Sequence, residues 1–214
     1  MNRKKTVKAL IIGVSAIIGI IVIRYLIIII ATVAAFGGFD KTYSIGDLIN
    51  NFNDKHSQIF SAKKYFNKIV PPNKIVEIEF KDDDEIERLS ISPRDTGRGS
   101  NIALEFEDWN LKLKSKRVDS ILKVLGWTNN TLSTLKEKLD EANCISIDNG
   151  DPGKIGFKRS GLGMYFFNVF DKPIPDNLKS RYNDSCTYIY VNPNLVLEYG
   201  GGAVGNQCFF NKRK

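Results

Sequence analysis

The chain has 214 residues, a sequence pI near 9.2 and a formal net charge of +7. Five of its 31 basic residues precede Tyr25, and all 24 acidic residues lie from Asp40 onward. The rest of the chain therefore has 26 basic residues against 24 acidic ones, a balance too even to attract a polyanion, and we expect no nucleic-acid partner.

The first predicted element is a transmembrane helix. A helix needs about 20 apolar residues, rising ~1.5 Å each, to cross ~30 Å of hydrocarbon. The run from Ala9 to Phe39 supplies that length with Arg24 as its only charge, and it is too short for two spans. For Arg24 we prefer the interpretation that its stem reaches toward the headgroups, or that the span shifts so that the charge lies off-centre. The alternative is that its charge pairs with an acidic residue of a partner helix.

A cleaved signal peptide is the alternative to a retained anchor, because basic residues precede the apolar run. The run far exceeds the usual ~7–15 apolar residues of a signal peptide, which favours retention. Four basic residues precede it, whereas Lys41 and Lys55 follow, so the bias predicts a cytoplasmic N-terminus and a domain outside the inner (plasma) membrane. We therefore expect a cytoplasmic segment at 1–8, a signal-anchor helix at 9–36, a joint at 37–43 and an extracytoplasmic domain at 44–214.

The domain is predicted to begin with a helix. Ser44 is a capping residue, the apolar positions from Ile45 to Ile69 follow a helical period, and Pro71 ends the pattern. A period of two then predicts strands at 74–80 and 86–92, with further candidates at 102–106 and 110–114.

Two short helices are predicted around Val118–Leu125 and Leu132–Leu139. Later strands are expected at 144–148, 154–158, 164–170, 187–191 and 195–199, the last two as a hairpin. This order predicts an α+β fold: one N-terminal transmembrane helix, then a single domain of mainly antiparallel sheet with about three helices.

Cys144, Cys186 and Cys208 are too few for a disulfide framework and too scattered for a paired-cysteine metal site. One disulfide is compatible with an extracytoplasmic location, and the pairing stays open. If the C-terminal strands form a simple meander, Cys186 and Cys208 lie at opposite ends of the sheet, too far apart to bond. We expect no metal and no other cofactor.

Three further patterns have structural interpretations. Gly200, Gly202 and Gly205 match a dinucleotide fingerprint, but only nine residues follow, too few for the required helix and second strand, so a turn is preferred. The sole histidine, His56, is expected at a helix surface or boundary rather than in a catalytic triad. The acidic run 82–85 lacks calcium-loop spacing and predicts a solvated turn.

Two groups of charged residues remain as functional candidates. Hydrolysis by paired carboxylates needs two acids ~5–9 Å apart, which any part of a sequence can supply; the candidates are Glu105, Glu107, Asp171 and Glu198. The second group is basic and comprises Lys112, Lys114, Lys116 and Arg117. It places several charges on one face of a predicted strand and at the end of that strand. These charges could contact an anionic surface, but we prefer the interpretation that they form a solvated edge.

The Ile-, Lys- and Asn-rich composition suggests a bacterial source. The preferred interpretation is a single-pass, bilayer-anchored protein whose non-catalytic extracytoplasmic domain binds a protein or envelope partner. A membrane-tethered or secreted envelope hydrolase using paired carboxylates is the first alternative, and an anchored inhibitor or immunity-type protein is the second. No residue is assigned a catalytic, cofactor-binding or metal-binding role.

Overall fold

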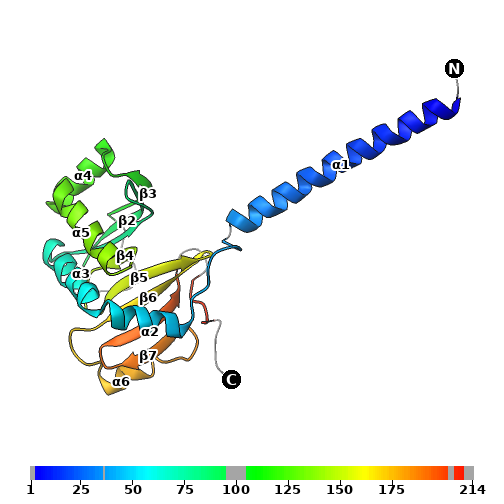
Figure 1. Ribbon diagram of the computed structural model, residues 1–214. Coiled ribbons are helices and arrows are strands. Elements are labelled where there is room, and N and C mark those ends of the chain that lie inside the picture. The colour runs from blue at the N-terminus through cyan, green and yellow to red at the C-terminus, as the bar shows by residue number, and fades with distance from the viewer. Residues whose placement is uncertain (1–2, 36, 95–104, 202–204, 210–214) are drawn as a thin grey trace. The chain divides into compact units, whose positions relative to one another are not determined.

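The computed structural model describes residues 3–35, 37–94, 105–201 and 205–209 and divides into two units, Met1–Lys41 and Thr42–Lys214. The first unit is the helix α1 (Arg3–Ala35) (Figure 1). Its segment Ser15–Ala34 is long and apolar enough to cross a membrane, a property that N-terminal signal sequences share. The predicted apolar N-terminal helix is confirmed, and it begins at Arg3 instead of Ala9.

The second unit begins with two helices instead of the single one predicted. Ser44 and Asp47 form a capping box that starts α2 (Ile45–Asp54), and α3 (His56–Ile69) follows after Lys55. The prediction of one helix was wrong at Lys55, whose backbone is not helical. Only one residue separates the two helices, so the apolar period continues across the break and gives no sign of it.

Eight strands form one sheet in the order β3-β2-β1-β4-β5-β6-β8-β7, and every pair of neighbours is antiparallel. The strands are β1 (Lys74–Phe80), β2 (Glu85–Pro93), β3 (Phe106–Lys112), β4 (Ser146–Asp148), β5 (Gly153–Ser160), β6 (Gly163–Val169), β7 (Tyr188–Asn192) and β8 (Leu195–Gly200). The predicted α+β class with a mainly antiparallel sheet is confirmed.

The bounds of the third strand, β3, differ from the prediction. The expected strand at 102–106 lies mostly outside the described residues, and the expected strand at 110–114 was wrong, because β3 ends at Lys112. Ser115 then accepts a hydrogen bond from the backbone N–H of Val118 and starts the next helix. The capping serine, rather than the apolar pattern, fixes where this strand must stop.

Three further helices lie in the domain: α4 (Lys116–Leu125), α5 (Asn129–Glu141) and the single turn α6 (Asp176–Lys179). The first two were predicted; Gly126 ends α4 in a left-handed conformation with φ +67°. With the break at Lys55 and the short α6, the described domain has five helices instead of about three.

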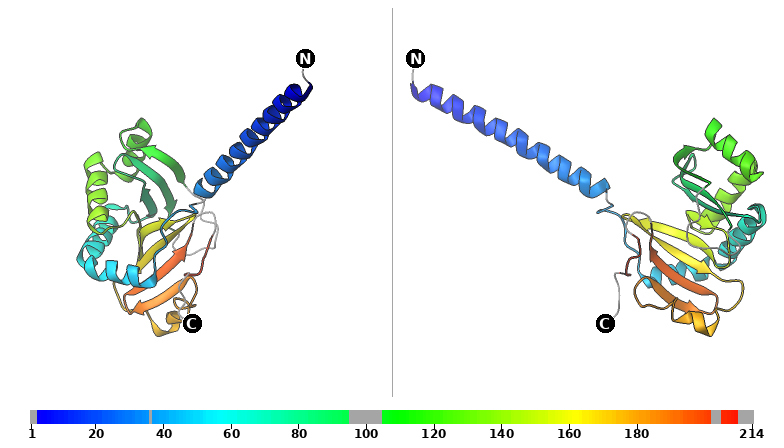
Figure 2. Two further views of the ribbon diagram at one scale, coloured as in Figure 1. Left: turned by 45° about the vertical axis from the view of Figure 1, so that its right-hand side comes forward. Right: turned by 180° about the vertical axis from the view of Figure 1, so that it is seen from behind.

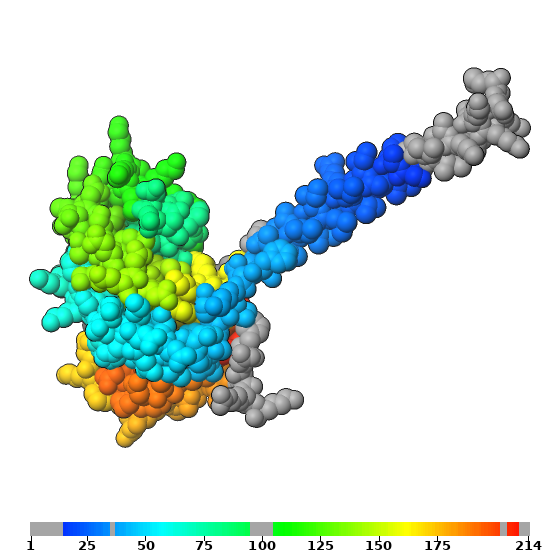
Figure 3. Space-filling model, viewed as in Figure 1, coloured from blue at the N-terminus to red at the C-terminus, as the bar shows by residue number. Residues whose placement is uncertain are grey.

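The core lies between the sheet and the helices α2, α3 and α5. The ribbon views from the front and from behind show these helices on one face of the sheet (Figures 1 and 2). In the space-filling view they form much of the domain surface that faces the viewer (Figure 3). Large side chains that are fully buried there include Leu48, Ile59, Phe66, Ile78 and Phe167. The helices α2, α3 and α5 do not cover the opposite face of the sheet.

The C-terminal segment reverses direction and runs back along the sheet. Gly200 and Gly201 have φ values of +135° and +90°, the N–H of Gly201 donates to the carbonyl of Gly205, and Gly200 and Asn206 form an antiparallel bridge, as a reversal of the chain requires. Gly202 lies outside the described residues. This reversal brings Cys208 to Cys186, where the two form a disulfide with a Cα–Cα distance of 4.2 Å. The C-terminal strands lie in the order β6-β8-β7 and not in a simple meander, so the condition under which the sequence kept these cysteines apart is not met, and the pairing left open is Cys186–Cys208.

Candidate functional site

One face of the sheet carries a group of polar side chains beside a small buried apolar cluster of Phe170, Ile174 and Val196. Side chains alternate along a strand, so Val76 and Ile78 of β1 enter the core while Glu77 and Glu79 point to the opposite side. We call that side the polar face. Glu79, Asn168 and Glu198 on it are each no more than 5% exposed. Buried polar groups are costly unless they are hydrogen-bonded, so their partners decide what this face can do.

Glu79 is held by Arg159 of β5. The Arg159 guanidinium donates to both carboxylate oxygens, with 2.6 Å between its second nitrogen and Oε2. Burial raises the pKa of Glu79 above its ordinary value of 4.5, and the hydrogen bond and charge of Arg159 oppose part of that shift. The same hydrogen bond raises the pKa of Arg159. This two-bond arrangement fixes the Arg159 side chain across the polar face.

Arg88 of β2 joins two acids from neighbouring strands. Its guanidinium donates to Glu77 at 2.8 Å and to Glu107 of β3 at 2.9 Å. It also lies 5.2 Å from the ring centroid of Trp109, a side chain that is 46% exposed. The result is an aromatic and charged platform at the β3 side of the polar face.

Glu198 of β8 is engaged from two strands. Lys154 of β5 donates to it at 2.7 Å, and the Asn168 amide donates at 2.9 Å. The Lys154 ammonium also lies 4.0 Å from the ring centroid of Phe166. Glu198 is therefore part of a satisfied network rather than a free carboxylate.

Asp148 of β4 is the exception on this face. It lies directly across from Glu77 on β1 and from Lys154 on β5. Burial, together with the neighbouring Glu77 charge, raises the pKa of Asp148 well above its ordinary value of 3.8. Within the part of the chain that the structure describes, no side chain donates a hydrogen bond to this carboxyl. Its environment thus favours the protonated form.

A hollow of about 250 Å³ opens on the polar face. It combines the Glu77, Glu79, Arg88 and Arg159 charges with apolar surface from Trp109, Leu162, Met164 and Phe166, and is completed by Glu87, Gly200 and Gly201. Charged groups of both signs beside an exposed indole suit a polar partner that offers donors, acceptors and a flat apolar surface. We take this hollow as the candidate binding site.

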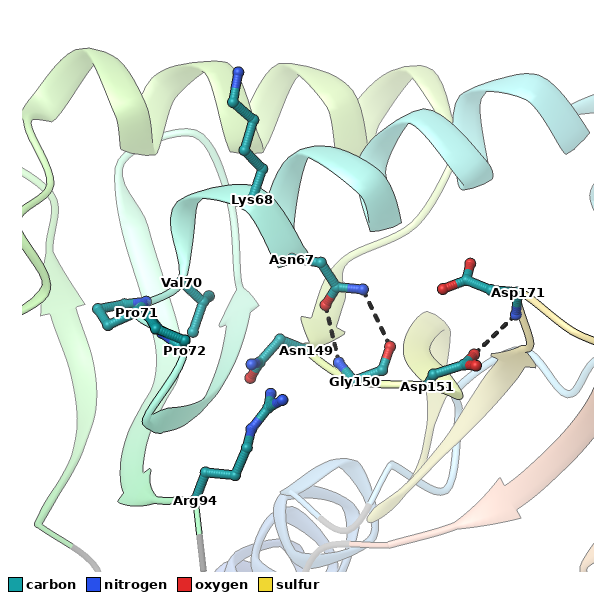
Figure 4. Close-up of a pocket in the computed structure, with 10 residues that line it drawn as sticks. All are labelled: Asn67, Lys68, Val70, Pro71, Pro72, Arg94, Asn149, Gly150, Asp151 and Asp171. Atoms are coloured by element: carbon teal, nitrogen blue, oxygen red, sulfur yellow. Dashed lines mark hydrogen bonds between the residues drawn. The ribbon is translucent and has the colours of Figure 1, made fainter. Parts of the chain in front are cut away.

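A larger cavity of about 460 Å³ lies beside the end of α3 (Figure 4). Its polar groups are largely bonded to one another: Asn67 exchanges two hydrogen bonds with the backbone of Gly150, and Asp151 accepts from the N–H of Asp171. The buried Lys63 ammonium donates to both of these aspartates, at 3.0 and 2.8 Å. These contacts tie loops to α3, so we assign the cavity a structural role.

The four predicted acidic candidates are not brought together. Glu105 pairs with Lys74, Glu107 with Arg88, Asp171 with Lys63, and Glu198 with Lys154. Among the described residues, no three His, Cys, Asp or Glu side chains gather closely enough to hold a metal ion. His56 is exposed and lies against Phe52 and Phe60, with centroids 5.3 and 4.6 Å away.

The basic group does not share one strand face as predicted. Lys112 ends β3, Lys114 lies in the turn, and Lys116 and Arg117 begin α4. The strand is shorter than expected because Ser115 caps the helix. All four side chains are exposed, and Arg117 donates to Asp108 at 2.8 Å. Arg24, the other predicted position, is exposed on α1.

The residues that dominate the polar face were not among the sequence candidates: Glu77, Glu79, Arg88, Asp148, Lys154 and Arg159. The alternation of β1 identified the side of the strand on which Glu77 and Glu79 lie. The same alternation describes an ordinary solvated face, so nothing in it indicated burial or the partners on other strands.

Comparisons with protein families, with curated proteins and with solved structures each gave no match. The functional argument therefore rests on the residues and geometry of this chain.

Proposed function

We propose that this chain is a single-pass membrane protein that presents a non-catalytic binding domain outside the cytoplasm, with the polar face as its contact surface. The observation that carries this proposal is the apolar helix α1. Its large aliphatic side chains between Ile17 and Val33 are at least 40% exposed, while the other unit buries a complete core of its own. Such a helix gains free energy only by entering another apolar medium, and a bilayer is the medium that its length fits.

The disulfide supports the proposed side of the membrane. Cys186 and Cys208 are bonded, and disulfides persist in oxidising compartments outside the cytoplasm. The remaining thiol, Cys144, is buried, and burial raises its pKa to about 12, so it is a poor partner for exchange. Basic residues before the span favour the same orientation.

The polar face supports a role in binding. Its ion pairs hold Arg88 and Arg159 in fixed positions around the hollow, and fixed polar groups lose little conformational entropy when a partner arrives. The exposed Trp109 adds the type of flat aromatic surface that is enriched in interfaces. A protein segment or an envelope polymer has the mixed polar and apolar chemistry that this surface can contact.

The location is tested with full-length protein tagged at the C-terminus. We expect the protein to remain in the membrane pellet after carbonate washing, and its domain to be digested by external protease in spheroplasts when a periplasmic control protein is digested. Extraction by carbonate, protection of the domain, or mature protein beginning near Phe36 would overturn the anchored arrangement.

The binding surface is tested by crosslinking and pull-down of the full-length protein from membranes. Trp109→Ala should reduce recovery of the partner at least tenfold, because it removes the exposed indole from the apolar lining of the hollow. Val124→Ala is the matched control: Val124 is 60% exposed on α4 and does not line the hollow. Equal recovery from both variants would exclude the hollow as the contact surface.

Asp148 gives one specific reason to keep hydrolysis by paired carboxylates as a second candidate. A carboxyl whose pKa is raised, lying across from Glu77 on the neighbouring strand, is the combination that acid catalysis uses. Against it, Arg88 already binds Glu77, and Asp148 does not line the hollow. Turnover of envelope glycans that disappears in both Asp148→Asn and Glu77→Gln would favour the enzyme.

A further inference from the structure

Arg24 lies at the middle of the apolar run Ala9–Phe39, with 15 residues on either side. The candidate span Ser15–Ala34 has 20 residues, and α1 continues through it without interruption. At a rise of ~1.5 Å per residue, Arg24 is ~14 Å from Ser15 and ~15 Å from Ala34 along the axis. A cation at that depth is unfavourable unless its charge is paired or reaches water.

Reaching the headgroups would require the whole helix to slide. A shift that brings Arg24 to the outer interface moves the aliphatic run Ile27–Ile30 out of the hydrocarbon, and the opposite shift removes Ile17–Ile23. Either displacement exposes large aliphatic side chains to water, and it also draws a second charged residue, Lys8 or Asp40, toward the hydrocarbon. A paired charge at the centre keeps both runs in lipid.

The chain itself offers no counter-charge within the span. The first acidic residue is Asp40, 16 positions after Arg24 and ~24 Å farther if the helix continued. A second parallel copy would place another arginine at the same depth, and like charges there would repel. A carboxylate that pairs with Arg24 inside the bilayer would therefore belong to a different membrane helix.

We propose that Arg24 pairs with an Asp or Glu inside a membrane-spanning helix of a different protein, which thereby assembles with this chain in the bilayer. The inference rests on the proposed function as a membrane-anchored protein. The contact face contains Ile20 and Ile28, one turn either side of Arg24, and Ala31 two turns beyond it, whose small side chain allows close approach.

The test places a photo-crosslinking amino acid at single positions of the full-length protein in its own membranes. Ile20 and Ile28 report on the Arg24 face, whereas Val22 and Leu26 lie on the opposite side of the helix and serve as matched controls; all four are 50–67% exposed. We expect one heterologous adduct from the Arg24 face and none from the controls. Its mass-spectrometric identification should show a span containing Asp or Glu.

Charge variants decide whether the adduct depends on the ion pair. Arg24→Leu should lower its yield at least tenfold and Arg24→Lys should retain it, while the amide variant of the partner acid should lower it equally. An unchanged yield in Arg24→Leu, labelling from both faces, an adduct only between two copies, a captured span without an acid, or no adduct at all would overturn the inference. Carbonate washing separates the two proposals: a chain that stays in the pellet without an Arg24-dependent adduct refutes the pairing alone.

Discussion

Removal of the Cys186–Cys208 disulfide should destabilise the domain by about 3 kcal/mol, the value that loop-closure entropy gives for a bridge of this span. The two cysteines are 22 positions apart. Cys186 is half-buried and Cys208 is exposed, so replacing both with serine leaves no large cavity and buries no new polar group. The entropic term should therefore dominate. The neighbouring Phe209 is 3% exposed and packs against Tyr165 and Tyr199. Its detachment in the variant would add to the loss of stability.

Urea unfolding of residues 42–214 measures this change, because that unit contains the described hydrophobic core. With a slope of about 2 kcal/mol per molar urea, the midpoint should fall by roughly 1.5 M in the double serine variant. Adding a thiol reductant should shift the wild-type midpoint by a similar amount and leave the variant unaffected. A variant whose unfolding free energy stays within about 0.5 kcal/mol of wild type would refute the reasoning.

Substitutions also test three further features of the domain. The folded-state pKa of Asp148 is raised, so the wild-type domain loses stability as pH rises from about 4 through that pKa. Asp148→Asn should therefore be more stable than wild type at pH 7 and equally stable near pH 3. A difference in urea midpoint that does not change with pH would contradict this. Arg159→Met leaves the buried Glu79 unpaired and should lower the free energy of unfolding by about 2 kcal/mol at pH 7, measured by thermal or urea unfolding. Arg117→Met, at an exposed ion pair, is the control and should lower it by under about 1 kcal/mol. Equal losses in the two variants would contradict the role given to burial. Gly126→Ala should cost about 1 kcal/mol through its left-handed backbone, since its Cβ would meet open space, and an unchanged midpoint would refute that strain.

Local patterns were sufficient for most of the fold. The alternation of β1, the apolar stripe of α4 and its closing Gly126 depend on residues close together in sequence, and each was predicted before any tertiary information. Predictions failed where one residue mattered: Lys55 divides a continuous apolar period, and Ser115 ends a strand early. A periodicity averaged over a window is insensitive to such single positions.

The candidate site depended on the sheet order instead. Glu79 and Arg159 are 80 positions apart, and Lys154 and Glu198 are 44 apart, so no local pattern links them. These side chains are brought together by the order of β1, β4, β5, β6 and β8 in the sheet, which is a property of the tertiary structure. The same holds for the disulfide, which needs the reversal after Gly200.

The sequence by itself determined the apolar helix that contains Arg24, most elements of the domain and the mainly antiparallel α+β class, because hydrophobic period and capping act over a few residues. Only the tertiary structure decided which acids are buried, which cations neutralise them and where a hollow opens. Burial and charge pairing are properties of side chains brought together from distant strands, and the free energy that selects among possible pairings belongs to the whole sheet.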